Sequence, residues 1–383
     1  MAYFDNAATT YPKPKDVYEF MDNFYRNYGG SYARGSYNSE NPIINIVSNT
    51  RAKMKEVLNA RNKAVVFTAT ATIALNMIIQ GLIKKNKVKK NIYISSFEHN
   101  AVTRILEYYK NKGDIEIDIL EIENNYSYNL EKLRYQFDKK KPDILIISHA
   151  SNVTGLIAPV EELAILAKEY SSFTVIDMSQ TAGLLNINLN LEAIDFAVFA
   201  GHKTLYAPTG ISGFFIKENI ELETVLFGGT GYDSANLEMP NSIPERYEIG
   251  TLNLQAIAGL NASLKWIEQI GINNLYQKEL ENRNKLKKIL KKYDFIKIIG
   301  DNEEANYVGI ISFVIDNISS DSMAPIFSQK NIIVRTGLHC APLAHKFLDT
   351  FPTGTIRLST SYFTNKKDFE ELIMLLDYIE TNI

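Results

Sequence analysis

The sequence reads FTVID at residues 173–177 and FAVFAGHK at residues 196–203. Both stretches open with apolar runs of five residues or fewer, too short for helices and typical of strands buried on both faces of a sheet. Each run leads into a residue that can carry charge, Asp177 in the first and Lys203 in the second. Such strands predict a parallel sheet whose carboxyl ends hold the reactive side chains.

The same pattern extends outward from these two stretches. Further strands are predicted at residues 91–95, 115–120, 143–148 and 211–216, and helices at 71–83, 100–112, 130–138 and 160–170. This alternation predicts an α/β fold with a mostly parallel, doubly wound sheet. A helical region over 254–292 with a break at Gly271 leads into strands at 308–315, 332–334 and 355–359 and a helix at 367–380.

A chain of 383 residues exceeds what one core usually supports. We therefore predict a large ligand-binding domain over residues 15–255 and a smaller α+β domain made of residues 1–14 and 256–383. The long irregular segment that follows the strand at 211–216 contains several glycines and prolines. Segments of that length in compact domains are often functional.

The composition indicates a globular protein that acts on a small molecule. Hydrophobic residues make up 45% of the chain, and 41 basic and 44 acidic residues leave a net charge of -3. Since there is no large basic field, we expect neither a nucleic-acid nor a membrane partner. The N-terminus has no secretory pattern and Cys340 is the single cysteine, so we expect a cytoplasmic protein.

Lys203 is the first candidate for chemistry. A lysine amine forms a Schiff base with an aldehyde cofactor when its surroundings lower its proton affinity. Asp177 could pair with a protonated pyridine nitrogen, and Gln180 could reach a ring hydroxyl. His99 follows another strand end and could stack on a ring or move protons. Taken singly, Asp177 could equally be a helix cap and Lys203 a solvated loop lysine.

Two further segments stand near strand ends. The segment FTATATI at residues 67–73 has the small residues and hydroxyls that a phosphate site at a helix start requires, although a simple capped turn has the same residues. Asn152 follows the strand predicted at 143–148. We expect both segments at the same edge of the sheet.

Taken in order, the motifs resemble the class V aminotransferase family, and within it the cysteine desulfurases and selenocysteine lyases. The motifs are NAATT (6–10), EHN (98–100), SNVTG (151–155), DMSQ (177–180), GHK (201–203) and RTGLHC (335–340). The resemblance extends from Asp5 to the C-terminal helix. It implies the fold type I architecture of the transferases that use pyridoxal 5′-phosphate (PLP), and no metal.

The resemblance also implies roles for single residues. Lys203 would carry PLP and Asp177 would pair with its pyridine nitrogen. Gln180 would bind the phenolic oxygen, and His99 would stack on the ring and take part in catalysis. The phosphate would be held by four residues, the last of them contributed by the other subunit of a homodimer: Ala71, Thr72, His202 and Thr251.

On the substrate side, the resemblance implies that Arg357 binds the carboxylate, a task that suits a bidentate guanidinium. Asn152, Ala8 and Arg335 would line the same side. Cys340 would be the nucleophile, since it ends the RTGLHC motif; a free cysteine that is buried and inert is the alternative. Many relatives have serine where this chain has Ala200, and often histidine where it has Leu338.

The activity implied is conversion of L-cysteine to L-alanine, with the sulfur passed to Cys340 as a persulfide and on to an acceptor protein. A selenocysteine lyase, or another class V reaction such as transamination or β-elimination, would use the same Lys203 and Asp177. A non-catalytic binding scaffold is the third reading. It leaves Lys203, Asp177 and His99 together unexplained, and no Gly-x-Gly-x-x-Gly follows an early strand.

Overall fold

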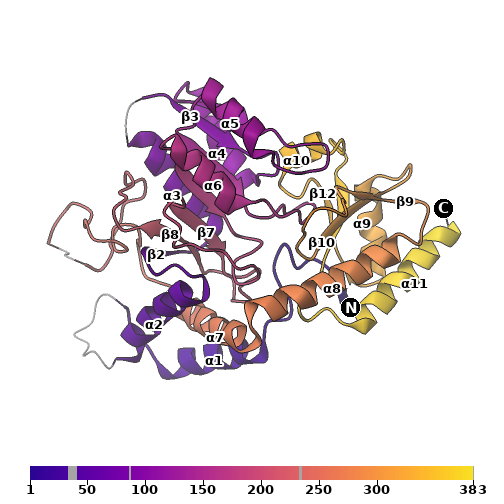
Figure 1. Cartoon of the computed structure of the whole chain (residues 1–383). Helices are drawn as coiled ribbons and strands as arrows, with labels where there is room; N and C mark the ends of the chain where they lie inside the picture. Colours follow the sequence, from indigo (N-terminus) through magenta and orange to yellow (C-terminus); the bar gives the residue numbers. More distant parts are fainter. Residues whose placement is uncertain (33–40, 86–87, 233–234, 383) are drawn as a thin grey trace.

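The computed structural model describes residues 1–32, 41–85, 88–232 and 235–382, which form two main β-sheets (Figure 1). Residues 63–217 supply the larger sheet, and residues 296–359 supply the smaller sheet, which lies near the C-terminal helix. Helix α8 (Ile272–Leu290) runs from the larger part of the molecule toward the smaller sheet (Figure 1).

Seven strands form the larger sheet: β2 (Lys63–Thr68), β3 (Lys90–Ile94), β4 (Ile115–Ile119), β5 (Ile144–Ser148), β6 (Phe173–Asp177), β7 (Phe196–Ala200) and β8 (Ser212–Lys217). Their order is β2-β8-β7-β6-β5-β3-β4. The strands from β4 to β7 pair in parallel, whereas β8 is antiparallel to both β2 and β7. Ser148 and Asp177 therefore end neighbouring strands in register at one edge of the sheet.

Helices cover both faces of this sheet. One face carries α3 (Ala71–Lys84) and α4 (Asn100–Asn111). The other carries α2 (Pro42–Val57), α5 (Leu130–Lys139), α6 (Val160–Glu169) and α7 (Leu254–Ile270), and α1 (Lys15–Asn27) packs on α7. Strand β5 shows why both faces need a cover, because its alternate side chains point to opposite faces and those of residues 144–147 are all apolar. Ile144 and Ile146 pack against the first layer of helices, and Leu145 and Ile147 pack against the second.

The smaller sheet is antiparallel, in the order β12-β13-β10-β9, with β9 (Ile296–Ile299), β10 (Ile310–Ile315), β12 (Arg335–Gly337) and β13 (Thr355–Ser359). Its core includes Phe313 and Leu358 and is completed by α8, α9 (Ser320–Gln329) and α11 (Lys366–Asn382). Strand β1 (Ala2–Tyr3) pairs in parallel with β11 (Ile332–Ile333), and α10 (Pro342–Phe347) follows β12.

The α/β class with a mostly parallel, doubly wound sheet is confirmed, and the predicted strands of that sheet agree with the structure to within one residue at each end. The helix break at Gly271 is confirmed as well, since α7 ends at Ile270 and Gly271 has a φ of 87°. Four strands (β1, β2, β9 and β12) and four helices (α1, α2, α9 and α10) were not predicted. Helix α9 contains Pro325, which argues against a helix in the sequence. The two domain boundaries remain predictions.

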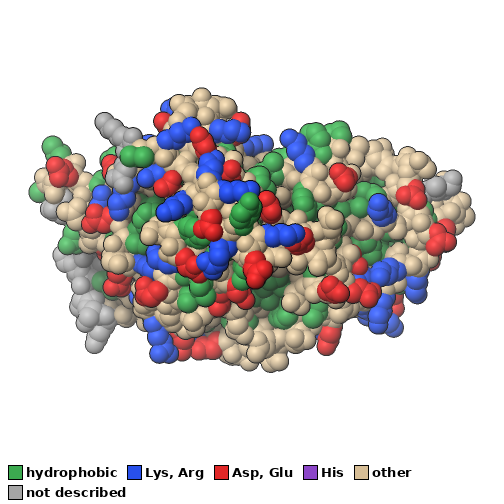
Figure 2. Space-filling view, turned by 45° about the horizontal axis from the view of Figure 1, so that its top comes forward, with side chains coloured by type: hydrophobic (Ala, Val, Ile, Leu, Met, Phe, Trp, Pro, Cys, Tyr) green, Lys and Arg blue, Asp and Glu red, His purple; other side chains and the backbone are tan. Residues whose placement is uncertain are grey.

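Side chains of both charges are interspersed over the face drawn in Figure 2, in line with a net charge of only -3. Across the part of the chain that is described, no helix is both long and apolar enough to traverse a bilayer.

Candidate active site

Lys203 lies on the turn that follows β7, and the backbone holds this turn tightly. The Gly201 N–H donates to the Ile211 carbonyl at 3.1 Å, and the Ala207 N–H donates to the Gly201 carbonyl at 2.8 Å. A Cβ at position 201 would collide with the Ile211 carbonyl, so only glycine lets the turn pack against the start of β8. Burial lowers the pKa of Lys203 to about 8, although the Asp177 carboxylate opposes that shift. A neutral, nucleophilic amine is thus accessible near physiological pH.

Asp177 ends β6 and is only 7% exposed. Its Oδ1 accepts hydrogen bonds from the Ser179 N–H at 2.9 Å and the Ser179 hydroxyl at 2.5 Å. Within the described chain, Asp177 forms no ion pair. A buried carboxylate that forms no ion pair is costly, so a positively charged ring nitrogen of a ligand would be stabilised here. Gln180 lines the same pocket, and its Nε2 donates to the Ala7 carbonyl at 3.0 Å.

His99 is the N-cap of α4, and this role fixes its tautomer. Its Nδ1 accepts the Ala101 N–H at 3.0 Å, so the ring proton is on Nε2. Burial lowers the pKa of His99 to about 4, and the charge of Lys203 acts in the same direction. His99 is therefore neutral at physiological pH, and it lines the pocket with its ring proton on Nε2.

Glu98, next to His99, was missed by the sequence analysis. It is fully buried, and its Oε1 accepts from the Ser95 hydroxyl at 2.6 Å and the Ser148 N–H at 2.8 Å. Its Oε2 accepts from the Ser148 hydroxyl at 2.8 Å. Burial raises the pKa of Glu98 to about 7. Because Ser148 is in register with Asp177, Glu98 ties the His99 loop to the strand beside Asp177.

One end of the site is suited to an anion. Thr70 caps α3 by accepting a backbone N–H with its hydroxyl at 3.2 Å, which leaves Ala71 and Thr72 in the first turn. The Nδ1 of His202 is buried without a hydrogen-bond partner in the described residues. A helix N-terminus beside an unsatisfied histidine nitrogen suits a phosphate. Thr251, by contrast, is exposed and lies outside this pocket, so its place in a partner's site remains a prediction.

The N-terminal segment joins the smaller sheet to the Lys203 turn. Asn6 donates to the Ser359 carbonyl at 2.8 Å, and the Thr10 N–H donates to the His202 carbonyl at 3.1 Å. Lys13, which the sequence analysis also missed, donates from Nζ to the Thr10 hydroxyl and the His202 carbonyl, both at 2.6 Å. Burial lowers the pKa of Lys13 to about 7. These contacts hold the turn from outside the larger sheet.

Arg357 lies on β13 and is 1% exposed. Its Nη2 donates to Asp5 Oδ1 at 2.7 Å and its Nη1 donates to the Asn152 carbonyl at 3.0 Å. Its Nε has no partner in the described residues. Of the five N–H groups of this guanidinium, three thus have no partner among the described residues. Ala8, from the same N-terminal segment as Asp5, lines the pocket beside Arg357.

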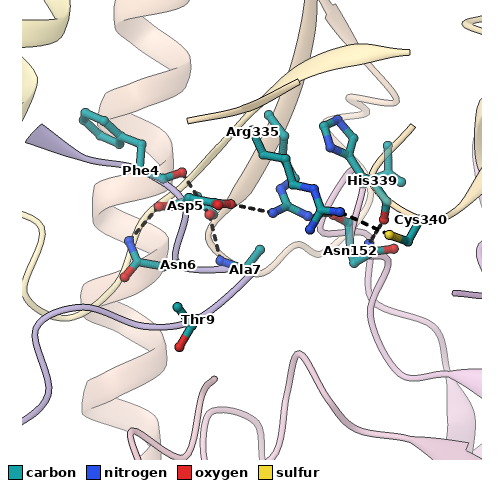
Figure 3. A network of polar contacts seen from close by, with 12 residues as sticks. Phe4, Asp5, Asn6, Ala7, Thr9, Asn152, Arg335, His339 and Cys340 are labelled. Atoms are coloured by element: carbon teal, nitrogen blue, oxygen red, sulfur yellow. Dashed lines mark hydrogen bonds and ion pairs between the residues drawn. The ribbon is translucent and has the colours of Figure 1, made fainter. Parts of the chain in front are cut away.

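Cys340 lies on the loop that follows β12, and hydrogen bonds join this loop to the rest of the site. The Asn100 N–H donates to the Cys340 carbonyl, and Asn152 Nδ2 donates to the His339 carbonyl, each at 2.7 Å. Arg335 donates from Nη2 to Cys340 Sγ at 3.1 Å (Figure 3). His339 and Cys340 both have left-handed backbones, with φ of 48° and 57°. A cation beside the sulfur is the setting in which a thiolate is stabilised.

Arg335 lines two neighbouring cavities. The first, which we call the inner pocket, has a volume of about 290 Å³ and contains Lys203. The second, the outer pocket, has a volume of about 840 Å³ and contains Cys340. Most of the predicted site residues line the inner pocket: Ala8, Ala71, Thr72, His99, Asn152, Asp177, Gln180, His202, Lys203, Arg335 and Arg357. Thr251 and Cys340 do not line the inner pocket. Cys340 lines the outer pocket, whose lining shares Arg335 with the inner one.

Known proteins share both sequence and fold with this chain. A protein of Pyrococcus abyssi strain GE5/Orsay, named probable cysteine desulfurase, is 29% identical over 98% of this chain and 93% of its own length. A protein of Shigella flexneri, named cysteine desulfurase, is 27% identical over 99% of this chain and 93% of its own length.

The fold is similar to a solved structure described as the apo structure of cysteine desulfurase from Thermococcus onnurineus NA1. The TM-score is 0.89 at 26% identity, and the alignment covers 100% of this chain and 95% of the other. The expected fold type I architecture is confirmed by this likeness. Because the family model of the class-V aminotransferases matches residues 2–372, this chain belongs to that family.

Proposed function

We propose that this protein is a PLP-dependent cysteine desulfurase that converts L-cysteine to L-alanine and passes the sulfur to Cys340. One observation carries the proposal: the single cysteine of the chain is hydrogen-bonded to Arg335, and Arg335 also lines the pocket of Lys203 and Asp177. The names of the relatives from P. abyssi and S. flexneri support it.

The inner pocket fits PLP on three counts. Lys203 is an amine whose proton affinity is reduced. Within the described residues, Asp177 is a buried carboxylate that forms no ion pair, and His202 has a buried nitrogen without a hydrogen-bond partner, in the pocket that the start of α3 also lines. When bound, PLP supplies an electron sink for the carbanion at Cα of an amino acid. Lys203 would anchor it, Asp177 would keep the pyridine nitrogen protonated, and His202 with the first turn of α3 would hold the phosphate.

The remaining residues of the inner pocket bind the substrate and move protons. The three free N–H groups of Arg357 and the guanidinium of Arg335 suit the substrate carboxylate. Lys203 Nζ takes the proton from Cα and returns one to the product, because its pKa of about 8 suits both directions. His99 acts as a ring platform and Nε2–H donor, since accepting a proton at Nδ1 would break its bond to Ala101.

Sulfur transfer requires the thiolate of Cys340. Its Sγ attacks the sulfur of L-cysteine and forms an S–S bond. The bond between that sulfur and Cβ breaks, its electron pair stays with the carbon, and a proton completes alanine. Arg335 compensates the charge of the attacking thiolate at 3.1 Å. No external oxidant is needed, because the carbon is reduced as the sulfur is oxidised.

The proposal extends to a cytoplasmic homodimer that hands sulfur to an acceptor protein. Thr251 is exposed in the single chain, as expected of a residue that would reach the phosphate site of the partner subunit. Light scattering tests this part. A dimer is expected, and a monomer with full activity would contradict the role of Thr251.

The decisive assay compares wild type with Cys340→Ala. Both proteins are loaded with PLP and given L-cysteine or L-selenocysteine, and alanine, sulfide and pyruvate are measured. Wild type is expected to form alanine from L-cysteine, and the variant is expected to lose that activity while it keeps its cofactor absorbance. Alanine formation that is unchanged in Cys340→Ala would refute the persulfide route, and pyruvate in place of alanine would indicate β-elimination.

A further inference from the structure

The outer pocket has a mixed lining that includes Cys340. Ile117, Leu338 and Leu343 supply apolar walls, and side chains of α4 and Lys346 of α10 supply polar ones. Its volume of about 840 Å³ lies within the range of ligand sites. Because Cys340 contributes to this wall and not to the inner pocket, a group on the sulfur can be reached from the outer side.

Positive charge dominates the lining. The lining contains one carboxylate, Glu107, and four cationic side chains: Arg104, Lys110, Arg335 and Lys346. Glu107 is paired with Lys110 at 3.9 Å. In the described part of the chain, Arg104 and Lys346 form no ion pair, and Lys346 lies over the Phe351 ring at 5.3 Å. A cavity with this excess of cations concentrates anions.

One buried histidine also lines the outer pocket. His339 lines the outer pocket and is 2% exposed. Its Nε2 is hydrogen-bonded to the Thr355 hydroxyl at 2.8 Å, whereas its buried Nδ1 has no partner in the described residues. Because Nδ1 itself is buried, the case for an anionic ligand rests on the cations of the lining.

We propose that the outer pocket selects an anionic thiol, one that carries or is flanked by carboxylates, as the acceptor of sulfur from Cys340. Arg104 and Lys346 attract the carboxylates, and the apolar walls pack against the carbon chain that links them to the thiol. The transfer rests on the proposed desulfurase activity; the preference of the pocket for anions does not.

The transfer step balances without a co-reactant. The thiolate of the acceptor attacks the terminal sulfur of the Cys340 persulfide and forms a new S–S bond. The bond between the terminal sulfur and Cys340 Sγ breaks, and its electron pair stays on Sγ. Arg335, which donates to Sγ at 3.1 Å, stabilises the thiolate that leaves. The enzyme returns to its starting state, and the acceptor carries the persulfide.

The first experiment tests the charge preference alone. Because Cys340 is the only cysteine, alkylation of the holoenzyme reports on one sulfur. The rates with iodoacetate and with iodoacetamide are measured, and their ratio cancels the fraction of thiolate because both reagents attack the same ion. In Arg104→Gln/Lys346→Gln, the ratio of the iodoacetate rate to the iodoacetamide rate is expected to fall roughly fivefold. The reason is that two positive charges near the sulfur, each acting through a medium of high dielectric constant, are lost.

The matched control, Lys292→Gln/Lys297→Gln, removes two exposed lysines near the smaller sheet and is expected to keep the ratio of wild type. Arg104→Lys/Lys346→Arg keeps both charges and is also expected to keep it. An equal ratio in the test variant and wild type would overturn the proposal, as would an equal fall in the control.

The second experiment tests the transfer. Persulfidated enzyme is mixed with 3-mercaptopropionate or 2-mercaptoethanol, and separately with a cysteine peptide flanked by glutamates or by glutamines. The anionic member of each pair is expected to remove the sulfur faster, and Arg104→Gln/Lys346→Gln is expected to reduce that advantage. Discrimination only between the peptides identifies a protein segment as the acceptor. No discrimination in either pair overturns the proposal.

The two experiments separate this proposal from the proposed function. If L-cysteine leaves no sulfur on Cys340, the desulfurase assignment fails, while the alkylation ratio still decides whether the pocket prefers anions. If alanine and persulfide form normally and the ratio is unchanged by the charge substitutions, only the inference about the acceptor fails.

Discussion

The inner and outer pockets differ in nearly every physical respect, although Arg335 lines both. The inner pocket is small, at about 290 Å³, and is lined by strand ends and by buried charged groups, of which Asp177 forms no ion pair within the described residues. The outer pocket, at about 840 Å³, is lined by side chains of α4, α10 and the Cys340 loop. The difference indicates a division of labour: bonds to carbon change in the first, and sulfur leaves through the second.

Removal of the cofactor anchor Lys203 should abolish the chemistry of the inner pocket and leave the reactivity of Cys340 in the outer pocket unchanged. Lys203→Ala is expected to lose the covalent cofactor absorbance and to reduce alanine formation by on the order of 10³-fold or more, since both the anchor and the proton carrier are lost. Alkylation of Cys340 by iodoacetamide should stay near the rate of wild type. Retained absorbance in the variant would contradict the assignment of Lys203.

Arg335 is the residue whose loss should affect both pockets. In Arg335→Gln, loss of the guanidinium at 3.1 Å from Sγ is expected to slow alkylation of Cys340 by roughly tenfold, and alanine formation by more, because the substrate carboxylate loses a partner as well. Arg335→Lys keeps the charge, so its rates of alkylation and of alanine formation should lie between those of wild type and Arg335→Gln. Full alkylation rate in Arg335→Gln would show that the contact does not activate the thiol.

The pH dependence of cofactor loading sharpens the description of the inner pocket. Only the neutral amine reacts with an aldehyde, and burial places the pKa of Lys203 near 8 instead of the usual 10.5. The rate at which PLP binds the apoprotein should therefore rise about tenfold per pH unit below 8 and level off above it. A rate that continues to rise toward pH 10 would contradict a lowered pKa.

Glu98 gives a smaller effect that is confined to the inner pocket. Glu98→Gln keeps the shape but loses the charge beside Asp177, and we expect a change of a few-fold in activity together with a shifted pH titration of the cofactor absorbance. Glu98→Ala leaves the Ser148 N–H unsatisfied and should lower the free energy of unfolding by about 2 kcal/mol. An unchanged titration in Glu98→Gln would leave Glu98 with a structural role only.

The inner pocket could largely be predicted from the sequence because its chemistry follows strand ends. Asp177 and Lys203 come at or just after apolar runs, and parallel strands bring such residues to one edge. Glu98 was missed because two of its three hydrogen bonds go to Ser148, 50 positions away. No local pattern records such a pair.

The outer pocket was harder to predict. The RTGLHC motif identified Cys340, yet not which cavity the sulfur would line. The position of Cys340 depends on hydrogen bonds from Asn100 and on left-handed backbone at His339 and Cys340, which are tertiary features of a loop. Arg104 and Lys346 belong to different helices, so their convergence could not be predicted from the sequence.

The central claim is that sulfur moves from the inner pocket to Cys340. The most direct measurement is the intact mass of the holoenzyme after a brief incubation with L-cysteine and without a reductant, for wild type and Cys340→Ser. Wild type is predicted to gain the mass of one sulfur atom and to form an equal amount of alanine, and the variant to gain none. Alanine formed by wild type without that gain, or an equal gain in Cys340→Ser, would contradict the account.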